Sequence, residues 1–411
     1  MIRSKILGII MAGGKGERLV PLTTERGKPA VPFGGKYRIV DFVLSNFVNS
    51  GIFSVYVLVQ YLSQSLIDYL RISWSNRGLT PDHFITVVPP QMRLGEMWYR
   101  GTADAVTQNL NLIRDFDPDY VAVFGADHIY RMDISQMLAY HVEKQAHVTI
   151  SALPVPLDEA KGFGILNVTK SGRVTEFEEK PKNPRPMPGD PDHAYSSMGN
   201  YIFNRDVLEE VLTEDIKKES AHDFGKSILP AILERCRVFA YNFGTAPLPG
   251  LKDYEEPGYW RDVGNIEAYW SAHMDLLGEK PRFDLNNDDW PIMAGRYNGP
   301  PSRILGRQVE DSILSEGVVV NGAFVRHSII GRGVVIEPGA VIEDSVLMDF
   351  CHVGRDCRFR KVVADRFNQF PDNTFIGQNP DQDQGSGFHV DKASGIVVVG
   401  RGRSKWAHLK R

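Results

Sequence analysis

The sequence predicts a doubly wound α/β sheet followed by a left-handed parallel β-helix. In the N-terminal part, apolar runs of strand length alternate with helical segments, which is the pattern of βαβ units. Between residues 318 and 359, apolar residues instead recur every six residues, which is typical of β-helix coils. With 411 residues, of which 42% are apolar and 24% charged, the chain has the length for both parts and the composition of a globular protein.

A glycine-rich loop follows the first predicted strand, 6–11. Its glycines, Gly13, Gly14 and Gly16, let the backbone turn tightly and present amide groups to an anion. The cations that follow are Arg18, Lys28, Lys36 and Arg38. Amides followed by cations suit a polyphosphate. The loop alone fits a tight strand-to-helix turn equally well, because it matches neither the GxxxxGK[ST] nor the GxGxxG pattern.

The rest of the N-terminal part supplies the other strands and helices. The expected strands are 54–59, 84–88, 120–124 and 148–153, and the expected helices are 63–72, 102–114, 134–144, 205–212 and 224–234. Short β segments over 161–203 predict an antiparallel hairpin region, and 259–270 predicts a strand end, a turn and a helix. Ligands of such sheets bind at the carboxyl ends of the strands, where the glycine loop, residues 99–102 and Asp127 are expected.

A six-residue repeat follows a linker. Residues 283–308 are rich in Pro, Gly, Asn and Asp, which predicts a linker between an α/β domain at 1–282 and a β-helix domain at 309–411. The apolar guide positions are Val318, Phe324, Ile330, Ile336 and Ile342, and Gly322, Ser328, Val334, Ala340 and Val346 follow them at plus four. The pattern restarts after a slip at Val353 and Phe359. Five steps in register favour a β-helix over a coincidental run of β-rich sequence.

Charge and cysteine content exclude several classes of partner and compartment. The net charge of −4 provides no basic field for nucleic acid, and no block of Lys and Arg predicts a membrane surface. The three cysteines, Cys236, Cys351 and Cys357, lack CxxC spacing and are expected to be reduced thiols. The apolar start of the chain runs directly into the glycine loop, so we do not interpret it as a signal peptide. These observations predict a cytoplasmic protein.

Several polar residues are candidates for chemistry, each beside a plainer alternative. Asp127 follows a predicted strand and could hold Mg²⁺, or it could be a helix-cap or turn residue. Lys180 offers a point charge for a phosphate monoester, and Glu179 could accept hydrogen bonds from sugar hydroxyls, although EEKP also fits a solvated turn. His128 could act as a general base, but a reaction in which an ionised phosphate oxygen attacks would need no base.

Longer motifs resemble a known family. Residues 13–32 match the pattern GGxGxRLxPLT followed by KPAVP, which resembles the signature of the sugar-nucleotide pyrophosphorylases, a group of nucleotidyltransferases. The following stretch, FGGKYRIVDFVLSN at 33–46, narrows the resemblance to the ADP-glucose pyrophosphorylases, or glucose-1-phosphate adenylyltransferases. The resemblance covers nearly the whole chain. It implies a Rossmann-like catalytic domain that makes ADP-glucose and pyrophosphate from ATP and α-D-glucose 1-phosphate, with Mg²⁺, for glycogen or other α-glucan synthesis.

The resemblance also implies roles for individual residues. For catalysis it implies Arg18, Lys28 and Asp127, and for the metal it implies Asp127 and Asp262. For the nucleotide it implies Gly13, Gly14, Gly16, Gln91, Gly101 and Thr102. For glucose 1-phosphate it implies Tyr99, Gly164, Glu179, Lys180 and Ser197, and for communication with a regulatory site it implies Gln60 and Trp98. His222, in HDFGKSILP, is expected to be structural or near the sugar.

The family is typically a homotetramer controlled by small-molecule allosteric effectors that bind near the junction of the two domains. Glu25 stands where some relatives carry a cation near the activator site, so the resemblance does not extend to fructose-bisphosphate-type activation. Two other functions remain open: a different nucleotide-sugar pyrophosphorylase, or a non-catalytic regulatory subunit of the same family. The joint presence of Arg18, Lys28, Asp127, Lys180 and Asp262 argues against the second.

Overall fold

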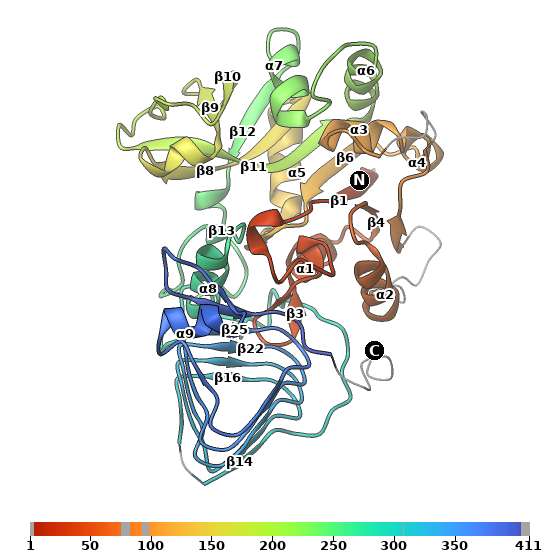
Figure 1. Ribbon diagram of the computed structural model, residues 1–411. Helices are drawn as coiled ribbons and strands as arrows, with labels where there is room; N and C mark the ends of the chain where they lie inside the picture. Colours follow the sequence, from red (N-terminus) through yellow and green to blue (C-terminus); the bar gives the residue numbers. More distant parts are fainter. Residues whose placement is uncertain (1–3, 75–82, 93–97, 307, 404–411) are drawn as a thin grey trace.

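The computed structural model describes residues 4–74, 83–92, 98–306 and 308–403. Figure 1 shows an α/β part above a β-helix with three sheets, so both parts of the predicted fold class are confirmed. The positions of the domain boundaries stay a prediction, and strand β14 (Arg303–Leu305) lies inside the segment expected to be a linker. Among the described residues, no helix combines the length and the apolar character that a membrane span requires.

Parallel strands form the half of the sheet that carries the glycine loop. Their order is β6, β1, β4, β5, and every pairing between them is parallel. Their bounds are β1 (Ile6–Ala12), β4 (Ser54–Val59), β5 (Phe84–Val88) and β6 (Tyr120–Gly125). These strands are confirmed as predicted. Strand β1 is largely buried, as its nearly continuous apolar sequence requires for a strand covered on both faces.

The other half of the sheet is mostly antiparallel. Strand β11 (His193–Asn204) pairs antiparallel with β6, β8 and β9. The remaining strands are β8 (Val148–Pro156), β9 (Gly164–Val168), β10 (Val174–Glu179) and β12 (Val238–Asn242). The β9–β10 hairpin confirms the antiparallel region predicted over 161–203. Two short strands, β7 (His128–Tyr130) and β13 (Trp260–Asp262), pair separately beneath the sheet.

The helices largely follow the predicted pattern, with α1 and α9 as the exceptions. They are α1 (Ile39–Asn49), α2 (Gln64–Ser73), α3 (Thr102–Thr107), α4 (Leu110–Phe116), α5 (Ile134–Glu143), α6 (Arg205–Asp215), α7 (Leu229–Ile232), α8 (Ile266–Met274) and α9 (Pro380–Gly385). Helix α1 was not predicted, and all of its residues from Ile39 to Phe47 are buried, including the polar Asp41, Ser45 and Asn46. Segment 224–234 begins as one π-helical turn, η4 (Phe224–Ile228), and continues as α7.

The helix predicted over 102–114 is two helices, α3 and α4. They are separated at Asn109, which has a non-helical backbone with φ −118° and ψ 18°. The Asn109 side-chain amide donates to the carbonyl of Ala105 at 2.8 Å and to the Tyr99 hydroxyl at 3.0 Å. A side chain that bonds the backbone in this way competes with the helical ladder. The break therefore follows from a local asparagine contact that periodicity does not report.

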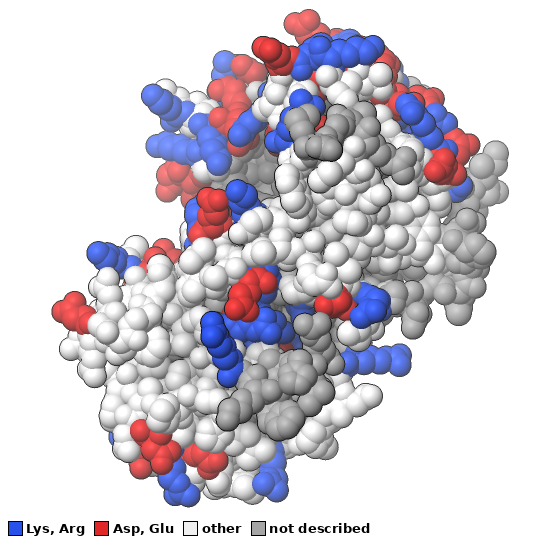
Figure 2. Space-filling model, turned by 45° about the vertical axis from the view of Figure 1, so that its right-hand side comes forward, with Lys and Arg blue, Asp and Glu red and all other residues white. Residues whose placement is uncertain are grey.

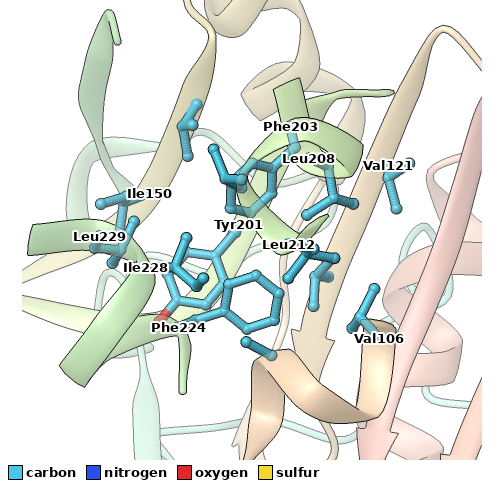
Figure 3. Close-up of a cluster of buried hydrophobic side chains, with 14 of the residues drawn as sticks. Val106, Val121, Ile150, Tyr201, Phe203, Leu208, Leu212, Phe224, Ile228 and Leu229 are labelled. Carbon is cyan, nitrogen blue, oxygen red and sulfur yellow. The ribbon is translucent and has the colours of Figure 1, made fainter. Parts of the chain in front are cut away.

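Aromatic side chains of β11 and η4 form the centre of one face of the sheet (Figure 3). Tyr201, Phe203 and Phe224 lie with ring centroids 5.5 to 6.1 Å apart, and leucines of α6 close the cluster. Phe224 is only 1% exposed. Burying aromatic rings on this scale contributes roughly 2–3 kcal/mol each. The cluster fixes the start of η4 against the sheet, next to the cleft.

The β-helix coils are shorter than three full hexapeptides. Successive strands of one sheet, such as β18 (Phe324–Arg326), β21 (Val341–Glu343) and β24 (Arg358–Arg360), lie 17 residues apart. The buried column follows Val325, Ile330, Ile336 and Ile342, so one side of each coil has five residues rather than six. The prediction of Phe324 as a guide position was wrong, because Phe324 is partly exposed and Val325 is buried. The slip seen before Val353 in the sequence is this same short side.

The remaining β-helix strands complete the three sheets. They are β15 (Val309–Glu310), β16 (Ile313–Leu314), β17 (Val319–Asn321), β19 (Ile329–Ile330), β20 (Val335–Ile336), β22 (Val346–Leu347), β23 (His352–Val353), β25 (Val362–Ala364), β26 (Gln369–Phe370), β27 (Phe375–Ile376), β28 (His389–Val390) and β29 (Val397–Val399). Left-handed residues mark the corners between them, as at Asp311, His327, Asp344 and Lys361. Their recurrence every 16 or 17 residues keeps the corners of successive coils aligned.

The β-helix and the α/β part share one hydrophobic core. Ile329, Val346 and Val363 of the β-helix pack in the same cluster as Phe42 of α1 and Tyr269 of α8. The indole of Trp270 donates to the carbonyl of Asp344 at 2.8 Å. On the face shown in Figure 2, Lys and Arg lie among Asp and Glu at the waist between the upper α/β part and the β-helix below. The two parts are therefore joined by apolar packing as well as by charged contacts.

Candidate active site

A cleft of about 480 Å³ opens at the carboxyl ends of the parallel strands. It lies between the glycine loop on one side and the β9–β10 hairpin on the other. The predicted site residues that line it are Gly13, Gly14, Lys28, Gln60, Tyr99, Gly101, Thr102, Asp127, Gly164, Glu179 and Ser197. Residues separated by up to 184 positions in the sequence, from Gly13 to Ser197, therefore face one cavity. Its size suits a nucleotide together with a small sugar.

The glycine loop packs directly against the segment that carries Lys28. Gly16 has φ +69°, a left-handed conformation that side chains rarely adopt. A Cβ at this position would lie 3.0 Å from side-chain carbons of Lys28 and Thr23. The Thr23 hydroxyl donates to the Gly16 carbonyl at 2.8 Å and holds this close approach. Gly16 thus serves the packing of the loop, whereas Gly13 and Gly14 line the cleft itself.

The Lys28 ammonium lies between two carboxylates at the base of the cleft. Its Nζ is 3.2 Å from Asp127 Oδ2 and 2.8 Å from Asp262 Oδ1, and Lys28 is 6% exposed. Burial by itself would lower the pKa of Lys28, but Asp127 and Asp262 outweigh it and raise the pKa above its ordinary value. Burial would likewise raise the pKa of Asp127, but His128 and Lys28 lower it well below its usual range. Lys28 and Asp127 are therefore both charged at neutral pH.

Strand pairing brings the two carboxylates together. In the antiparallel β7–β13 pair, Asp262 stands opposite His128, the neighbour of Asp127. One ligand atom from each of Asp127, His128 and Asp262 lies within 4.8 Å of the others. Carboxylate oxygens beside a phosphate-binding loop are suitable ligands for Mg²⁺, which keeps several waters and binds phosphate oxygens as well. His128 Nδ1 is buried without a hydrogen-bond partner among the described residues, and it lies 3.5 Å from Asp127 Oδ1.

Arg18 reaches the same corner from the glycine loop. A Cβ on Gly264 would lie 2.8 Å from Arg18 Nη2 and 3.1 Å from both Asp262 carboxylate oxygens. Gly264 therefore leaves the space in which the guanidinium approaches the carboxylate. Arg18 itself is exposed and does not line the cleft. Arg18 thus lies near Asp262 at the edge of the cleft, whereas Lys28 contacts Asp262 directly.

Gln60 fixes the backbone of Tyr99. The Gln60 side chain accepts from the Tyr99 N–H at 2.8 Å and donates to the Tyr99 carbonyl at 3.4 Å. The Tyr99 hydroxyl accepts from Asn109, and burial raises the pKa of Tyr99 above its ordinary value. Tyr99 thus stays a neutral hydroxyl that lines the cleft. Gln60, expected to serve communication, also lines the cleft directly.

The sugar side of the cleft is built by β9, β10 and β11. Gly164 is required here, because a Cβ would lie 2.6 Å from the ring of Phe177 and 3.0 Å from the Glu179 carboxylate. Ser197 faces the same space from β11. Lys180 follows at the rim with φ +51°, and its N–H donates to the Phe163 carbonyl at 3.0 Å. Its side chain is exposed, next to Glu179 but outside the cleft lining.

Some predicted residues lie away from the cleft. Among the described residues, Gln91 and Trp98 are not part of the lining, and both are exposed. The Gln91 amide donates to the Pro89 carbonyl at 2.8 Å, and the Trp98 side chain is 58% exposed. The structure therefore does not place Gln91, which was expected to bind the nucleotide, in the lining of the cleft. Glu25, also outside the cleft, pairs with Arg401 at 3.2 Å.

Other lining residues carried no clear signal in the sequence. Met11, Leu58 and Ala105 form an apolar wall near the glycine loop. Tyr201, Asp223 and Gly225 line the opposite side. The available signal was Asp223 before a helical pattern, and its side chain does cap η4 by accepting from the Lys226 N–H at 3.0 Å. His128, which we discounted as a base, also lines the cleft.

Comparison with known proteins gives matches over both parts of the chain. Residues 7–279 match the nucleotidyl transferase family, and residues 302–399 match the C-terminal hexapeptide family named GlmU-like. The chain is 51% identical over 398 residues to a glucose-1-phosphate adenylyltransferase of Thermodesulfovibrio yellowstonii, covering 97% of this chain and 96% of the relative. It is 48% identical to glucose-1-phosphate adenylyltransferases of Anaeromyxobacter sp. and Thermus thermophilus, covering 96% and 98% of this chain and 98% and 99% of those relatives. The chain therefore belongs to the glucose-1-phosphate adenylyltransferase family of nucleotidyl transferases.

Proposed function

We propose that this protein transfers the adenylyl group of ATP to α-D-glucose 1-phosphate, giving ADP-glucose and pyrophosphate for glycogen or other α-glucan synthesis. The observation that carries the proposal is the position of Lys28 between Asp127 and Asp262, beside the glycine loop and in one cleft with Glu179. Nearly full-length similarity to relatives that bear this activity in their names supports it.

The cleft explains how the reaction would proceed. A phosphate oxygen of the sugar phosphate attacks the α-phosphorus in line, one P–O bond forms, and the bond to the leaving pyrophosphate breaks. No general base is needed, because the attacking oxygen is already ionised. Lys28 and Arg18 hold the triphosphate and offset the negative charge that develops on it. Glu179 and Ser197 orient the sugar hydroxyls from the opposite wall.

We also propose that Mg²⁺ binds at Asp127 and Asp262. The two carboxylates lie close enough to share one cation, and they open onto the place where phosphates would lie. When bound, Mg²⁺ supplies Lewis-acid charge that polarises the phosphoryl oxygens. The supporting observation is that Lys28 already provides a positive charge between the same two carboxylates.

A substrate panel tests the proposed function. The purified chain is assayed for pyrophosphate release with ATP, CTP, UTP, GTP or dTTP, each with glucose 1-phosphate and Mg²⁺. We expect turnover with ATP well above that with the other nucleotides. Preference for another nucleotide or sugar phosphate would identify a different pyrophosphorylase. No turnover with any pair would favour the regulatory subunit, and would contradict the proposal.

Replacing Lys180 is expected to act on the sugar phosphate. In Lys180→Ala, the KM for glucose 1-phosphate should rise roughly 10- to 150-fold, corresponding to ~1.5–3 kcal/mol for one charge-assisted contact. The KM for ATP should change little, because the glycine loop and Lys28 are untouched. Initial rates with each substrate varied in turn measure the two constants. Lys182→Ala, which removes an exposed lysine of the same loop, is the control, and equal rises in both KM values would show that Lys180 is misassigned.

We further propose that small-molecule effectors bind at the junction of the two parts. Arg26, Arg38 and Arg366 gather there, and burial together with the charges of Arg26 and Arg38 lowers the pKa of Arg366 to about 9. Arg26 pairs with Asp365, but Arg26 Nη1 and Arg366 Nε are buried without hydrogen-bond partners among the described residues. A cluster of guanidinium groups with unsatisfied N–H donors favours the binding of an anion.

Replacing Arg366 tests this junction site. Turnover is measured while a panel of sugar phosphates and inorganic phosphate is titrated. In Arg366→Met, we expect the response to anions to weaken by about tenfold or more in the concentration needed, because one charged donor is lost. Basal kcat should stay within about threefold, since Arg366 is not in the cleft lining. Arg358→Met, at an exposed β-helix position, is the control. An unchanged anion response in Arg366→Met would contradict the site.

A homotetramer in the cytoplasm completes the proposal. Strand β14 lies at the edge of its sheet, and its side chains Ile304 and Leu305 are 52% and 40% exposed. An exposed apolar strand at the open end of a β-helix favours self-association. Light scattering on the full chain measures the assembly. The three cysteines are buried and unpaired, as expected for a reducing compartment.

A further inference from the structure

The wall of the cleft near Thr102 is made from two distant segments. Thr102 begins α3, and Asp223 lies 121 residues later, just before η4. The Thr102 hydroxyl donates to Asp223 Oδ2 at 2.9 Å, and the Phe224 N–H donates to the same hydroxyl oxygen at 3.0 Å. Thr102 and Asp223 both line the cleft, on the sides assigned to the nucleotide and the sugar. The spacing between the two substrates depends on how these segments meet.

The backbone of His222 is the second link between them. Its carbonyl accepts from the N–H groups of Ala103 at 2.9 Å and Asp104 at 3.1 Å, the first free amides of α3. The approach is so close that a Cβ on Gly101 would lie 2.3 Å from this carbonyl oxygen. Gly101 therefore has a steric reason to be glycine. The carbonyl of His222 fixes the start of α3, and with it Gly101 and Thr102.

His222 holds this carbonyl in place with an unusual backbone. Its φ is +49°, in the left-handed region that is uncommon for residues other than glycine, although asparagine, aspartate and histidine adopt it more often than most. Such a conformation persists only where surrounding contacts determine it. Phe224, two residues on, is anchored in the aromatic core of Figure 3 and fixes one end of the segment. The other end needs its own anchor.

The side chain of His222 supplies that anchor. The ring is buried, with the residue 5% exposed, and Nδ1 is 2.7 Å from Asp215 Oδ2 at the end of α6. Ser220 completes the arrangement, because its hydroxyl donates to Asp215 Oδ1 at 2.8 Å and accepts from the His222 N–H at 3.0 Å. The Ser220 oxygen is also 3.1 Å from His222 Nδ1. His222 is not part of the cleft lining, so it does not face the substrates.

We propose that His222 is a positioning residue for the reaction, held by Asp215 and Ser220 in the left-handed conformation that directs its carbonyl to α3. Through that carbonyl and the adjoining Asp223 it sets the distance between the nucleotide wall and the sugar wall of the cleft. The proposal rests on the proposed function for its kinetic effect, but its structural core concerns only the attachment of α3. No proton transfer by His222 is involved.

Kinetics of two His222 variants give the first test. In His222→Ala, we expect kcat/KM for both substrates to fall about 10- to 100-fold, as for a small misplacement of reacting groups. His222→Asn should stay within about threefold of the parent, because asparagine tolerates positive φ and can donate to Asp215. His141→Ala is the matched control, because His141 is equally buried and makes two side-chain hydrogen bonds, yet lies on α5 outside the cleft lining.

These outcomes separate positioning from stability. His141→Ala should lose thermal stability but keep KM and kcat at a temperature well below its Tm. If His222→Ala kept parental KM and kcat under the same conditions, or if His222→Asn lost as much as His222→Ala, the positioning role would be wrong. Ser220→Ala is the milder variant should His222→Ala not fold. It is expected to reduce kcat/KM about threefold to tenfold, and parental kinetics would count against the proposal.

Amide hydrogen exchange tests the same contact without turnover. The N–H groups of Ala103 and Asp104 should exchange about tenfold or more faster in His222→Ala, since they lose a fixed acceptor. Exchange is followed by mass spectrometry on peptides covering 101–107, with His141→Ala as the control. Unchanged protection in His222→Ala would overturn the proposal even if the enzyme were active. Faster exchange in a chain that turns over no substrate would instead retain it and reject the proposed function.

Discussion

The Asp127→Asn variant is expected to fold normally and to lose kcat by about 100-fold or more, the size typical for removal of one preorganised electrostatic element. Asparagine keeps the size of the side chain and removes its charge. Asp127 lies at the end of β6, 3.2 Å from Lys28 Nζ, and faces the cleft. Losing the charge weakens the proposed Mg²⁺ site and releases Lys28 from one partner, so transition-state charge is offset less well.

Steady-state rates at saturating ATP and glucose 1-phosphate measure the effect, and circular dichroism checks the fold. The control is Asp115→Asn, which removes an exposed carboxylate of α4 outside the cleft lining. Raising the Mg²⁺ concentration should restore part of the activity of Asp127→Asn, since Asp262 remains. Parental kcat in Asp127→Asn at low Mg²⁺ would rule out the metal role.

The Lys28→Met variant is expected to lose about 100- to 1000-fold in kcat and, at the same time, to bind Mn²⁺ more tightly in the absence of nucleotide. The first effect follows from removing a buried cation beside the triphosphate site. The second follows because the ammonium lies 3.2 and 2.8 Å from the carboxylates that a cation would share. Without it, the apparent Kd for Mn²⁺ should fall about tenfold or more.

Electron paramagnetic resonance of free Mn²⁺ measures this binding directly and needs no turnover. Methionine fills nearly the volume of lysine, so the buried site should stay packed. Lys144→Met, which removes a lysine paired with Glu143 on α5, controls for general loss of positive charge. Weaker Mn²⁺ binding in Lys28→Met than in the parent would mean that Lys28 supports the metal site instead of occupying it.

Local motifs made the glycine loop and the strands of the sheet predictable. Apolar strands such as β1 and β4 are short, continuous and bounded by turn residues, so their positions follow from sequence alone. Helix α1 escaped prediction because it is buried on all sides, and its polar residues Asp41, Ser45 and Asn46 bond within the core instead of facing solvent. The α3–α4 break escaped because it depends on the side chain of Asn109. Hydrophobic periodicity indicates which face of a helix is buried. It does not report a helix buried on all sides or a break inside a helix.

The register of the β-helix, meaning which residues point inward, was predicted only in part. The six-residue spacing correctly predicted the class of coil, but it placed Phe324 inside, where the structure has Val325. Coils of 16 or 17 residues contain one short side, and a single missing residue exchanges inward and outward positions. Left-handed residues such as His327 and Asp344 mark that side, and they are neither glycine nor proline. A pattern search for glycine turns does not find them.

The candidate site was predictable where residues adjoin a motif and not where tertiary pairing places them. Asp127 follows a strand and could be proposed directly. The approach of Asp262 depends on the β7–β13 register, and the presence of Asp223 depends on the contact between Thr102 and a segment 121 residues away. Gln91 illustrates the converse, since its chemistry suits adenine but its amide lies outside the cleft.

Helix α8 connects the β-helix to Asp262 of the cleft. Figure 1 shows α8 between β13 and the β-helix. Asp262 ends β13, and Asn265 caps α8 three residues later by accepting from the Ala268 N–H at 2.8 Å. At the middle of the helix, the Trp270 indole donates to the Asp344 carbonyl at a corner of the β-helix. Only three residues lie between Asp262 and the start of α8, so no loop long enough to absorb a displacement separates Asp262 from Trp270. We therefore expect a tilt of the β-helix relative to the sheet to shift α8 as a rigid body. That shift would move the Asp262 carboxylate, for which Lys28 and a metal ion would compete.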